Sequence, residues 1–341
     1  MAQLDAATLA DPAWIAHRYD LPRDAFVLRR FPREAHHTVP FLTDEYLGPA
    51  PAEPDWVARG QVAGLPPPAP LHFIFHSAFC NSTLLARAFD QPGLAMGLSE
   101  PVVLNDLVGL RRRGEVDGPG LGQRCDASLS LLARGWGPGE AVIVKPSNIV
   151  NALAPGLMSL RPAARAIVMH TDLPLFLGSV ARKGLWARLW VRELAEGFLR
   201  DGLLAPLGLA AEDVLRLTDL QTAAAGWLAQ QLVFADLAKR FGPARVRGLV
   251  AERLYPDPAP VLGAVADHFG LSREPAARAA LAQADALQRH SKTGAAFDMA
   301  ARRAEQAHAA ALHAEEIDAV IAWSRVCAER AGVPMDLPHP I

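Results

Sequence analysis

The chain of 341 residues has no long apolar run and no excess of charge of one sign. No window approaches the roughly 20 consecutive apolar residues that a membrane-spanning helix needs. Its 34 basic and 36 acidic side chains nearly cancel, which excludes an overall basic field that would attract nucleic acid or an anionic membrane. Any binding site for an anion must therefore be built locally, from a few residues.

Cysteine is scarce and follows no pattern. Cys80, Cys125 and Cys327 lie far apart in the sequence and lack metal-ligand spacing, so we expect neither a disulfide framework nor a metal cofactor. The N-terminus carries an early acid and no apolar block after a basic start, so we expect no signal peptide. These features together predict a soluble, cytoplasmic protein.

Short apolar runs alternate with longer amphipathic stretches after residue 70. Runs of this kind are typical of strands that are buried on both faces, and the stretches between them have helical periodicity. Strands that alternate with helices form βαβ units, so the pattern predicts a three-layer α/β fold with a mainly parallel sheet. The predicted strands cover residues 71–75, 141–145, 164–170 and 245–250, and the predicted helices cover 82–89, 101–112, 148–160, 175–200 and 222–241.

Two segments rich in proline punctuate the chain. Residues 51–70 predict an irregular connector, and residues 254–260 end one strand and open a helix. A short strand at 25–31 and a short helix at 41–47 are expected before the connector. We therefore predict an N-terminal segment and linker (1–70), an α/β core (71–271) and a helical C-terminal extension packed on the core (272–341).

The turn after the first core strand has the composition of an anion site. In FIFHSAFCNSTLLARAF (73–89) an apolar strand enters a polar turn, and a helix follows at once. A helix that begins there directs free N–H groups and the positive end of its dipole at the turn. Asn81 tolerates the left-handed backbone that such a turn needs, and Ser82 and Thr83 can cap the helix or donate hydroxyls to a phosphate. An ordinary strand–turn–helix with a Ser/Thr cap is the alternative.

The same turn departs from the Walker pattern G-x-x-x-x-G-K-[ST]. His76 and Asn81 take the glycine places, Ser82 takes the place of the lysine, and Thr83 supplies the final hydroxyl. The missing lysine weighs against an enzyme that hydrolyses ATP or GTP, because that lysine neutralises charge on the outer phosphates.

Six segments, in order, resemble motifs of the bacterial sulfotransferases. The loop at 73–89 resembles their 5′-phosphosulfate loop, and residues 164–179 resemble their strand and loop for the 3′-phosphate. Such a resemblance implies a fold of the P-loop nucleoside triphosphate hydrolase type. It also implies 3′-phosphoadenosine-5′-phosphosulfate as the sulfuryl donor and no metal. The other four segments are SEPVVLND (99–106), VIVKPSNI (142–149), LVAERLYPDPAPVLGAVADHFGL (249–271) and HSKTGAAFD (290–298).

The resemblance implies a set of donor-binding residues, with two departures. Phe79 stands where the family's loop has a basic residue, and Thr171 stands where the 3′-phosphate motif has arginine. The missing charge would have to come from Lys145, Arg182, Lys183 or Lys292, and Lys145 is best placed because it ends a strand. The implied donor-binding residues are Ser77, Ala78, Phe79, Cys80, Asn81, Ser82, Thr83, Thr171, Ser179, Arg182 and Lys292.

Sulfuryl transfer needs positioning, charge stabilisation at the bridging oxygen and a base for the acceptor. Glu100 is the first candidate base and His76 the second, while Lys145 is the expected contact to sulfate or phosphate. Each has a simpler interpretation. Glu100 could stabilise a helix start, His76 could be packed in the core, and Lys145 could extend to solvent.

Three functions stay open from the sequence. The first is a sulfotransferase-like enzyme whose acceptor is a hydroxyl or amine of a small molecule, sugar or lipid. A small-molecule kinase on the same fold is the second. The third is a catalytically silent nucleotide-binding module, which Phe79 and Thr171 favour.

Overall fold

A computed structural model describes residues 6–48, 54–65, 68–255, 257–272, 274–282, 284 and 313–341. Five strands form one sheet in the order β5-β6-β4-β7-β8, and three form a second sheet in the order β1-β2-β3. The pairs β5–β6 and β4–β6 are parallel. The predicted class, a mainly parallel α/β sheet flanked by helices, is confirmed.

The chain divides into two compact units. The first unit comprises Met1–Phe75, Ser82–Ile167 and Pro258–Ala296, and the second comprises His76–Asn81, Val168–Asp257 and Phe297–Ile341. The boundary passes through β4 (Leu71–His76) and β7 (Ala166–His170), each of which contributes residues to both units. The three-part division expected from the sequence has other boundaries and stays a prediction.

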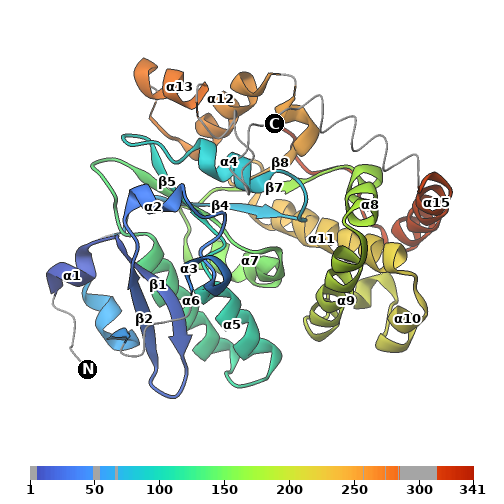
Figure 1. Ribbon diagram of the computed structural model, residues 1–341, viewed down its shortest axis with the longest axis horizontal. Helices are drawn as coiled ribbons and strands as arrows, with labels where there is room; N and C mark the ends of the chain where they lie inside the picture. The colour runs from blue at the N-terminus through green and yellow to red at the C-terminus, as the bar shows by residue number, and fades with distance from the viewer. Residues whose placement is uncertain are drawn as a thin grey trace. The chain divides into compact units, whose positions relative to one another are not determined.

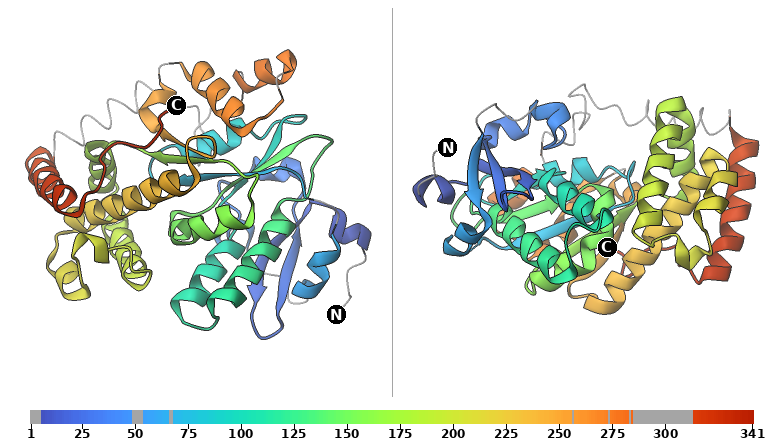
Figure 2. Two further views of the ribbon diagram at one scale, coloured as in Figure 1. Left: turned by 180° about the vertical axis from the view of Figure 1, so that it is seen from behind. Right: turned by 90° about the horizontal axis from the view of Figure 1, so that it is seen from below.

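The first unit contains nearly all of β4, the strands β5 and β6, and the small antiparallel sheet β1-β2-β3. Figures 1 and 2 show α4 and α12 on one side of its core strands and α6 and α7 on the other. Its other strands are β1 (Trp14–Asp20), β2 (Ala25–Arg30), β3 (Asp55–Ala58), β5 (Ala95–Ser99) and β6 (Ala141–Lys145). Its helices are α1 (Ala6–Ala10), α2 (Arg33–His36), α3 (Asp44–Leu47), α4 (Ser82–Ala88), α5 (Val103–Arg112), α6 (Gly118–Leu132), α7 (Ala154–Leu160), α12 (Pro258–Phe269) and α13 (Pro275–Ala282), with 3-10 turns η1 (Arg59–Gly64) and η2 (Asn148–Leu153).

Close packing in this unit depends on Gly97 in β5. A Cβ atom at this position would lie 2.4 Å from the carbonyl oxygen of Ala86 in α4, far inside van der Waals contact. Only glycine lets the helix backbone approach the strand so closely. That approach fixes α4, and with it Thr83, relative to the ends of β5 and β6.

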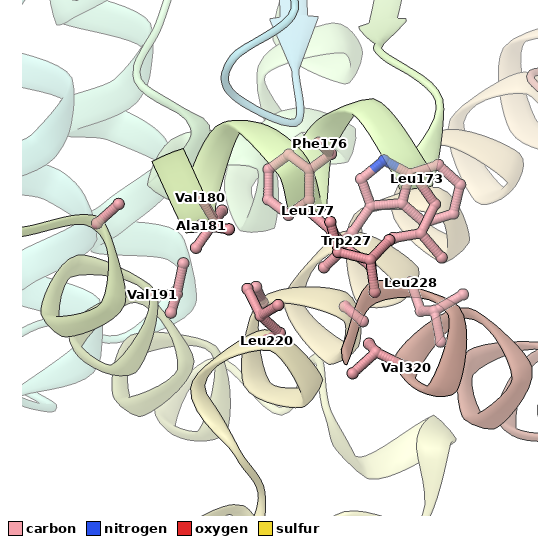
Figure 3. Close-up of a cluster of buried hydrophobic side chains, with 14 of the residues drawn as sticks. Leu173, Phe176, Leu177, Val180, Ala181, Val191, Leu220, Trp227, Leu228 and Val320 are labelled. Atoms are coloured by element: carbon pink, nitrogen blue, oxygen red, sulfur yellow. The ribbon is translucent and has the colours of Figure 1, made fainter. Parts of the chain in front are cut away.

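The second unit is a helical cluster attached to β8 (Val246–Val250). Figure 3 shows side chains of α8, α9, α11 and α15 pointing toward one another, with Trp227 among them. Trp227, Phe176 and Leu228 are each at most 1% exposed. The helices are α8 (Leu173–Arg182), α9 (Gly184–Arg200), α10 (Ala211–Arg216), α11 (Asp219–Phe241) and α15 (Ala314–Ala331), with 3-10 turns η3 (Ala205–Leu207) and η4 (Ala251–Leu254).

Two sequence expectations about elements are wrong. Residues 51–70 are not wholly irregular, because β3 pairs with β2 and η1 follows it. The single helix expected over 175–200 is two helices, α8 and α9, which meet at Lys183 and Gly184. Gly184 has φ of 62°, a left-handed conformation that ends the helical hydrogen-bond pattern at little cost only for glycine. None of the described helices is both long and apolar enough to cross a membrane.

Candidate functional site

Lys145 and Glu100 form an ion pair at the carboxyl ends of two neighbouring parallel strands. Ser99, the last residue of β5, is the register partner of Lys145, the last residue of β6. The Lys145 ammonium Nζ pairs with Glu100 Oε1, and the backbone N–H of Glu100 donates to the Lys145 carbonyl at 2.7 Å. Open parallel sheets bind ligands at this edge, so the pair lies where a reactive site is expected.

The Lys145 side chain is only 1% exposed, whereas that of Glu100 is 18% exposed. Thr83 Oγ1, in the first turn of α4, accepts a longer hydrogen bond from Nζ at 3.4 Å. The ring of Phe41 lies 4.8 Å from Nζ and completes the ammonium's surroundings. Burial of a cation is costly without such partners, so these four side chains form one electrostatic unit.

The N-terminal segment holds the main chain around Glu100. Leu42 N–H donates to the carbonyl of Ser99 at 2.8 Å, and Val102 N–H donates to the carbonyl of Leu42 at 3.1 Å. Glu100 itself has φ of 50°, which is unusual for a residue with a Cβ atom. Backbone strain of this kind clusters at functional sites and persists only where surrounding bonds enforce it.

Tyr46 in α3 adds a hydroxyl near this pair. Burial, followed by the negative charges of Glu45 and Glu100, raises the pKa of Tyr46. Its ring packs edge-on against Phe41 with the centroids 5.7 Å apart. Phe41 and Tyr46 are not predictable as site residues from the sequence, because aromatic residues in a short N-terminal segment carry no motif.

The loop after β4, in the second unit, has an unusual backbone. Asn81 is left-handed as predicted, with φ of 58°, and so are Ala78 and Phe79 at 73° and 52°. Ser77 N–H donates to the carbonyl of Met169 at 3.0 Å, and Cys80 Sγ donates to the same oxygen at 3.6 Å. These bonds anchor the loop to β7.

Ser77 in this loop has a buried hydroxyl without a hydrogen bond to any described residue. The residue is fully buried, and no described atom forms a hydrogen bond with Oγ. A hydroxyl in this state lacks the partner that buried polar atoms normally have. His76, by contrast, is 5% exposed and accepts a hydrogen bond from Ala78 N–H through Nδ1 at 3.1 Å. That bond fits the packed histidine of the simpler interpretation, and a role as base stays a prediction.

Phe79 belongs to an aromatic cluster in the second unit. Its ring lies 5.9 Å from that of Phe176 and 5.3 Å from that of Trp190, measured between centroids. Lys183 Nζ lies 5.4 Å above it. The loop therefore presents at this position a ring that packs against the helical core, with a lysine from the end of α8 beside it.

Thr171 and Ser179, the residues expected at the 3′-phosphate, already have partners. Thr171 Oγ1 hydrogen-bonds to Glu252 Oε1, and Ser179 Oγ donates to the Leu175 carbonyl at 2.9 Å. Burial raises the pKa of Glu252, although the hydrogen bond from Thr171 opposes it. A phosphate would have to replace these bonds, so the two assignments stay predictions.

The remaining predicted site residues differ in their exposure to solvent. Arg182 is exposed at the end of α8, Asn81 is partly exposed, and Ser82 and Thr83 are buried. Lys292 and the loop HSKTG lie outside the described residues. In the described ranges no three His, Cys, Asp or Glu side chains gather closely enough to hold a metal ion. The structure thus brings together Lys145, Glu100 and Thr83 of the predicted set.

Comparison with known proteins gives sulfotransferases among solved structures, at low similarity. The sulfotransferase domain from the curacin biosynthetic pathway is 17% identical, with a TM-score of 0.38, over 67% of this chain and 81% of that one. The sulfotransferase domain of the Synechococcus PCC 7002 olefin synthase is 16% identical, with a TM-score of 0.42, over 69% and 83%. Sulfotransferase STF9 from Mycobacterium avium is 13% identical, with a TM-score of 0.40, over 76% and 79%.

No protein-family model and no curated protein sequence matches the chain. Because the structural overlaps are weak, the fold assignment rests on the chain's own strand order and pairing. Function has to be derived from the side chains at the site.

The donor that the sequence implies carries its transferable sulfuryl group at the phosphosulfate, which is here called the transferring end. Lys145 supplies a buried positive charge and Thr83 a hydroxyl, both within the first unit. Cations and hydroxyls are the groups that bind anionic phosphosulfate. These residues fit the transferring end, whereas the described side chains expected at the 3′-phosphate are engaged elsewhere.

Proposed function

We propose that the protein is a sulfotransferase-like enzyme that moves a sulfuryl group from 3′-phosphoadenosine-5′-phosphosulfate to a hydroxyl or amine acceptor. The contact between Lys145 and Glu100 at the ends of β6 and β5 carries this proposal. It places one buried cation and one carboxylate, the two charged groups that this transfer requires, within a single hydrogen bond of each other.

Each side chain has a distinct role in the proposed reaction. Lys145 would donate a hydrogen bond to the oxygen that bridges phosphorus and sulfur, where negative charge develops as the sulfur–oxygen bond breaks. Glu100 would accept the proton of the acceptor hydroxyl as the new oxygen–sulfur bond forms. Thr83 would hold the ammonium in place. The products are the sulfated acceptor and adenosine 3′,5′-bisphosphate, and the proton stays on Glu100 until water removes it.

Phe79 and Thr171 support a second candidate, a nucleotide-binding module without catalysis. Phe79 contributes a packed ring instead of a charge, and Thr171 hydrogen-bonds to Glu252. A fold provides no activity when its site has lost the required groups. Under this alternative Lys145 would serve structure alone.

Calorimetric titration with adenosine 3′,5′-bisphosphate tests the proposal. We expect micromolar binding by the wild type and at least tenfold weaker binding by Lys145→Met, a change of about 1.4 kcal/mol. Lys239→Met, which removes an exposed lysine at the end of α11, is the matched control and should bind like the wild type. Absence of binding at millimolar nucleotide would reject the donor and with it the sulfotransferase activity.

A further inference from the structure

Lys145 has a charged partner before any ligand binds. Its ammonium is enclosed by Glu100, Thr83 and the ring of Phe41, and the side chain is 1% exposed. Of these neighbours only Glu100 carries a negative charge. An anionic ligand that uses Lys145 therefore has to compete with the protein's own carboxylate.

The exposure of the two partners indicates where a ligand would enter. The Glu100 side chain is 18% exposed and reaches solvent, whereas Lys145 does not. Thr83 is buried and uncharged, and its helix α4 is held close to β5 at Gly97. Glu100 is the movable neighbour, and the position of its carboxylate is the position that a ligand anion would take.

Main-chain bonds restrict that movement to the Glu100 side chain. Its N–H donates to the Lys145 carbonyl, and the flanking residues Ser99 and Val102 both bond to Leu42. The backbone at φ of 50° is thereby fixed from both sides. Rotation about the side-chain bonds would carry the carboxylate from Lys145 toward solvent without disturbing the sheet.

We infer that Glu100 occupies the anion site of Lys145 in the ligand-free protein, and that an anionic group of the donor displaces it and so releases it to act as the base. This inference rests on the proposed function. Exchange of one anion for another keeps the buried ammonium paired throughout, which avoids the cost of an isolated buried charge. Donor binding must then precede proton removal from the acceptor, which gives an ordered reaction.

Anion binding to Glu100→Gln tests the inference directly. Glutamine keeps an oxygen that accepts a hydrogen bond from Lys145 but has no charge to compete with a ligand. We expect adenosine 3′,5′-bisphosphate and inorganic pyrophosphate to bind Glu100→Gln at least tenfold more tightly than the wild type in calorimetric titrations. Glu45→Gln, a change at an exposed neighbour of Tyr46, removes the same charge and should leave both affinities unchanged.

The outcomes separate this inference from the proposed function. If the wild type binds the nucleotide and Glu100→Gln binds no more tightly, displacement is wrong while the donor site stands. If neither probe binds the wild type but pyrophosphate binds Glu100→Gln, Lys145 is a masked anion site and the nucleotide donor is wrong. If neither protein binds either probe, both proposals fall. An equal gain in Glu45→Gln would also overturn displacement, because net charge alone would explain it.

A second variant guards against misfolding of Glu100→Gln. Glu100→Asp keeps the charge but shortens the side chain by one methylene, which draws the carboxylate away from Lys145. Displacement predicts tighter binding of pyrophosphate to this variant than to the wild type, by a smaller factor than in Glu100→Gln. Unchanged or weaker binding in a variant with wild-type circular dichroism would reject it.

Discussion

Strands β6 and β7 belong to the same sheet but end in different chemistry. β6 ends at Lys145, whose charge is paired with Glu100. β7 ends at His170 and is followed by Thr171, a neutral side chain that hydrogen-bonds to Glu252. Burial lowers the pKa of His170 to about 4 and raises that of Glu252. One strand end therefore holds a charge by pairing it, and the other favours neutral groups.

The surroundings of the two strand ends follow the same division. In the first unit, charged side chains bind the N-terminal segment to the rest: Arg18 pairs with Asp106, and Arg33 pairs with Asp90 and Glu140. In the second unit, rings and aliphatic side chains surround Phe79 and Trp227. Paired charges add directional contacts, whereas apolar packing supplies most of the stability. The second unit should therefore respond more strongly to loss of volume, and the first to loss of one partner of a charge pair.

The largest effect is expected from Trp227→Ala, in the apolar cluster. Trp227 is 1% exposed, stacks on His170 and donates from Nε1 to the Thr171 carbonyl at 3.1 Å. Loss of the ring should lower the free energy of unfolding by about 4 kcal/mol, because the cavity cannot close fully. Urea denaturation, monitored by circular dichroism, measures this loss in the free energy of unfolding. Trp186→Ala, at a position 61% exposed, should change the free energy by less than about 0.5 kcal/mol.

The next largest effect is expected at the Lys145–Glu100 pair. Replacement of one partner should lower the free energy of unfolding by a different amount from replacement of the other. Glu100→Gln leaves the buried Lys145 ammonium without a charged partner and out of reach of water. We therefore expect a loss of about 3 kcal/mol in the free energy of unfolding. Lys145→Met leaves a carboxylate that can turn to solvent, so about 1 kcal/mol is expected. Urea denaturation of both single variants and the double variant measures the asymmetry. A double variant no more stable than Glu100→Gln would show that the stranded charge is not the cause.

The smallest effect is the dependence of stability on pH. Burial, followed by the charges of Arg165 and His268, lowers the pKa of His72 from 6.5 to about 3. Below pH 6.5 His72 therefore binds a proton in the unfolded chain but stays neutral in the folded chain. The free energy of unfolding falls as the pH drops from 6.5 toward 3. At pH 5 the loss from this residue should be about 2 kcal/mol relative to pH 7.

His72→Asn should flatten this part of the profile. Asparagine keeps an acceptor for the Arg165 N–H, which His72 Nδ1 accepts at 3.2 Å, but does not titrate. Urea midpoints at pH 7 and pH 5 compare the two proteins. His339→Asn, at an exposed position whose φ of 47° suits asparagine, is the control and should leave the slope as in the wild type. A wild-type slope in His72→Asn would assign the dependence to other groups.

The core strands were predictable from the sequence because they are buried on both faces. The run AVIVK gives β6 with the predicted bounds, and the run LHFIF gives β4 with one residue more. Strand β5 was missed, since AMGLS is short and contains a glycine that serves packing against α4. β3 was missed because prolines on either side suggested an irregular connector.

The sequence determined which residue types lie at the ends of the elements. It did not determine which side chains contact one another. Lys145 could be assigned to a strand end, because parallel strands bring their carboxyl ends to one edge, and Glu100 could be assigned to the residue before a helix start. Their direct pairing, and the place of Phe41 over Lys145, depend on segments more than 40 residues apart in the chain. Sequence periodicity is local and contains no information about such contacts. The tertiary structure alone decided that Lys145 is buried and already paired, because only the packed sheet removes it from water.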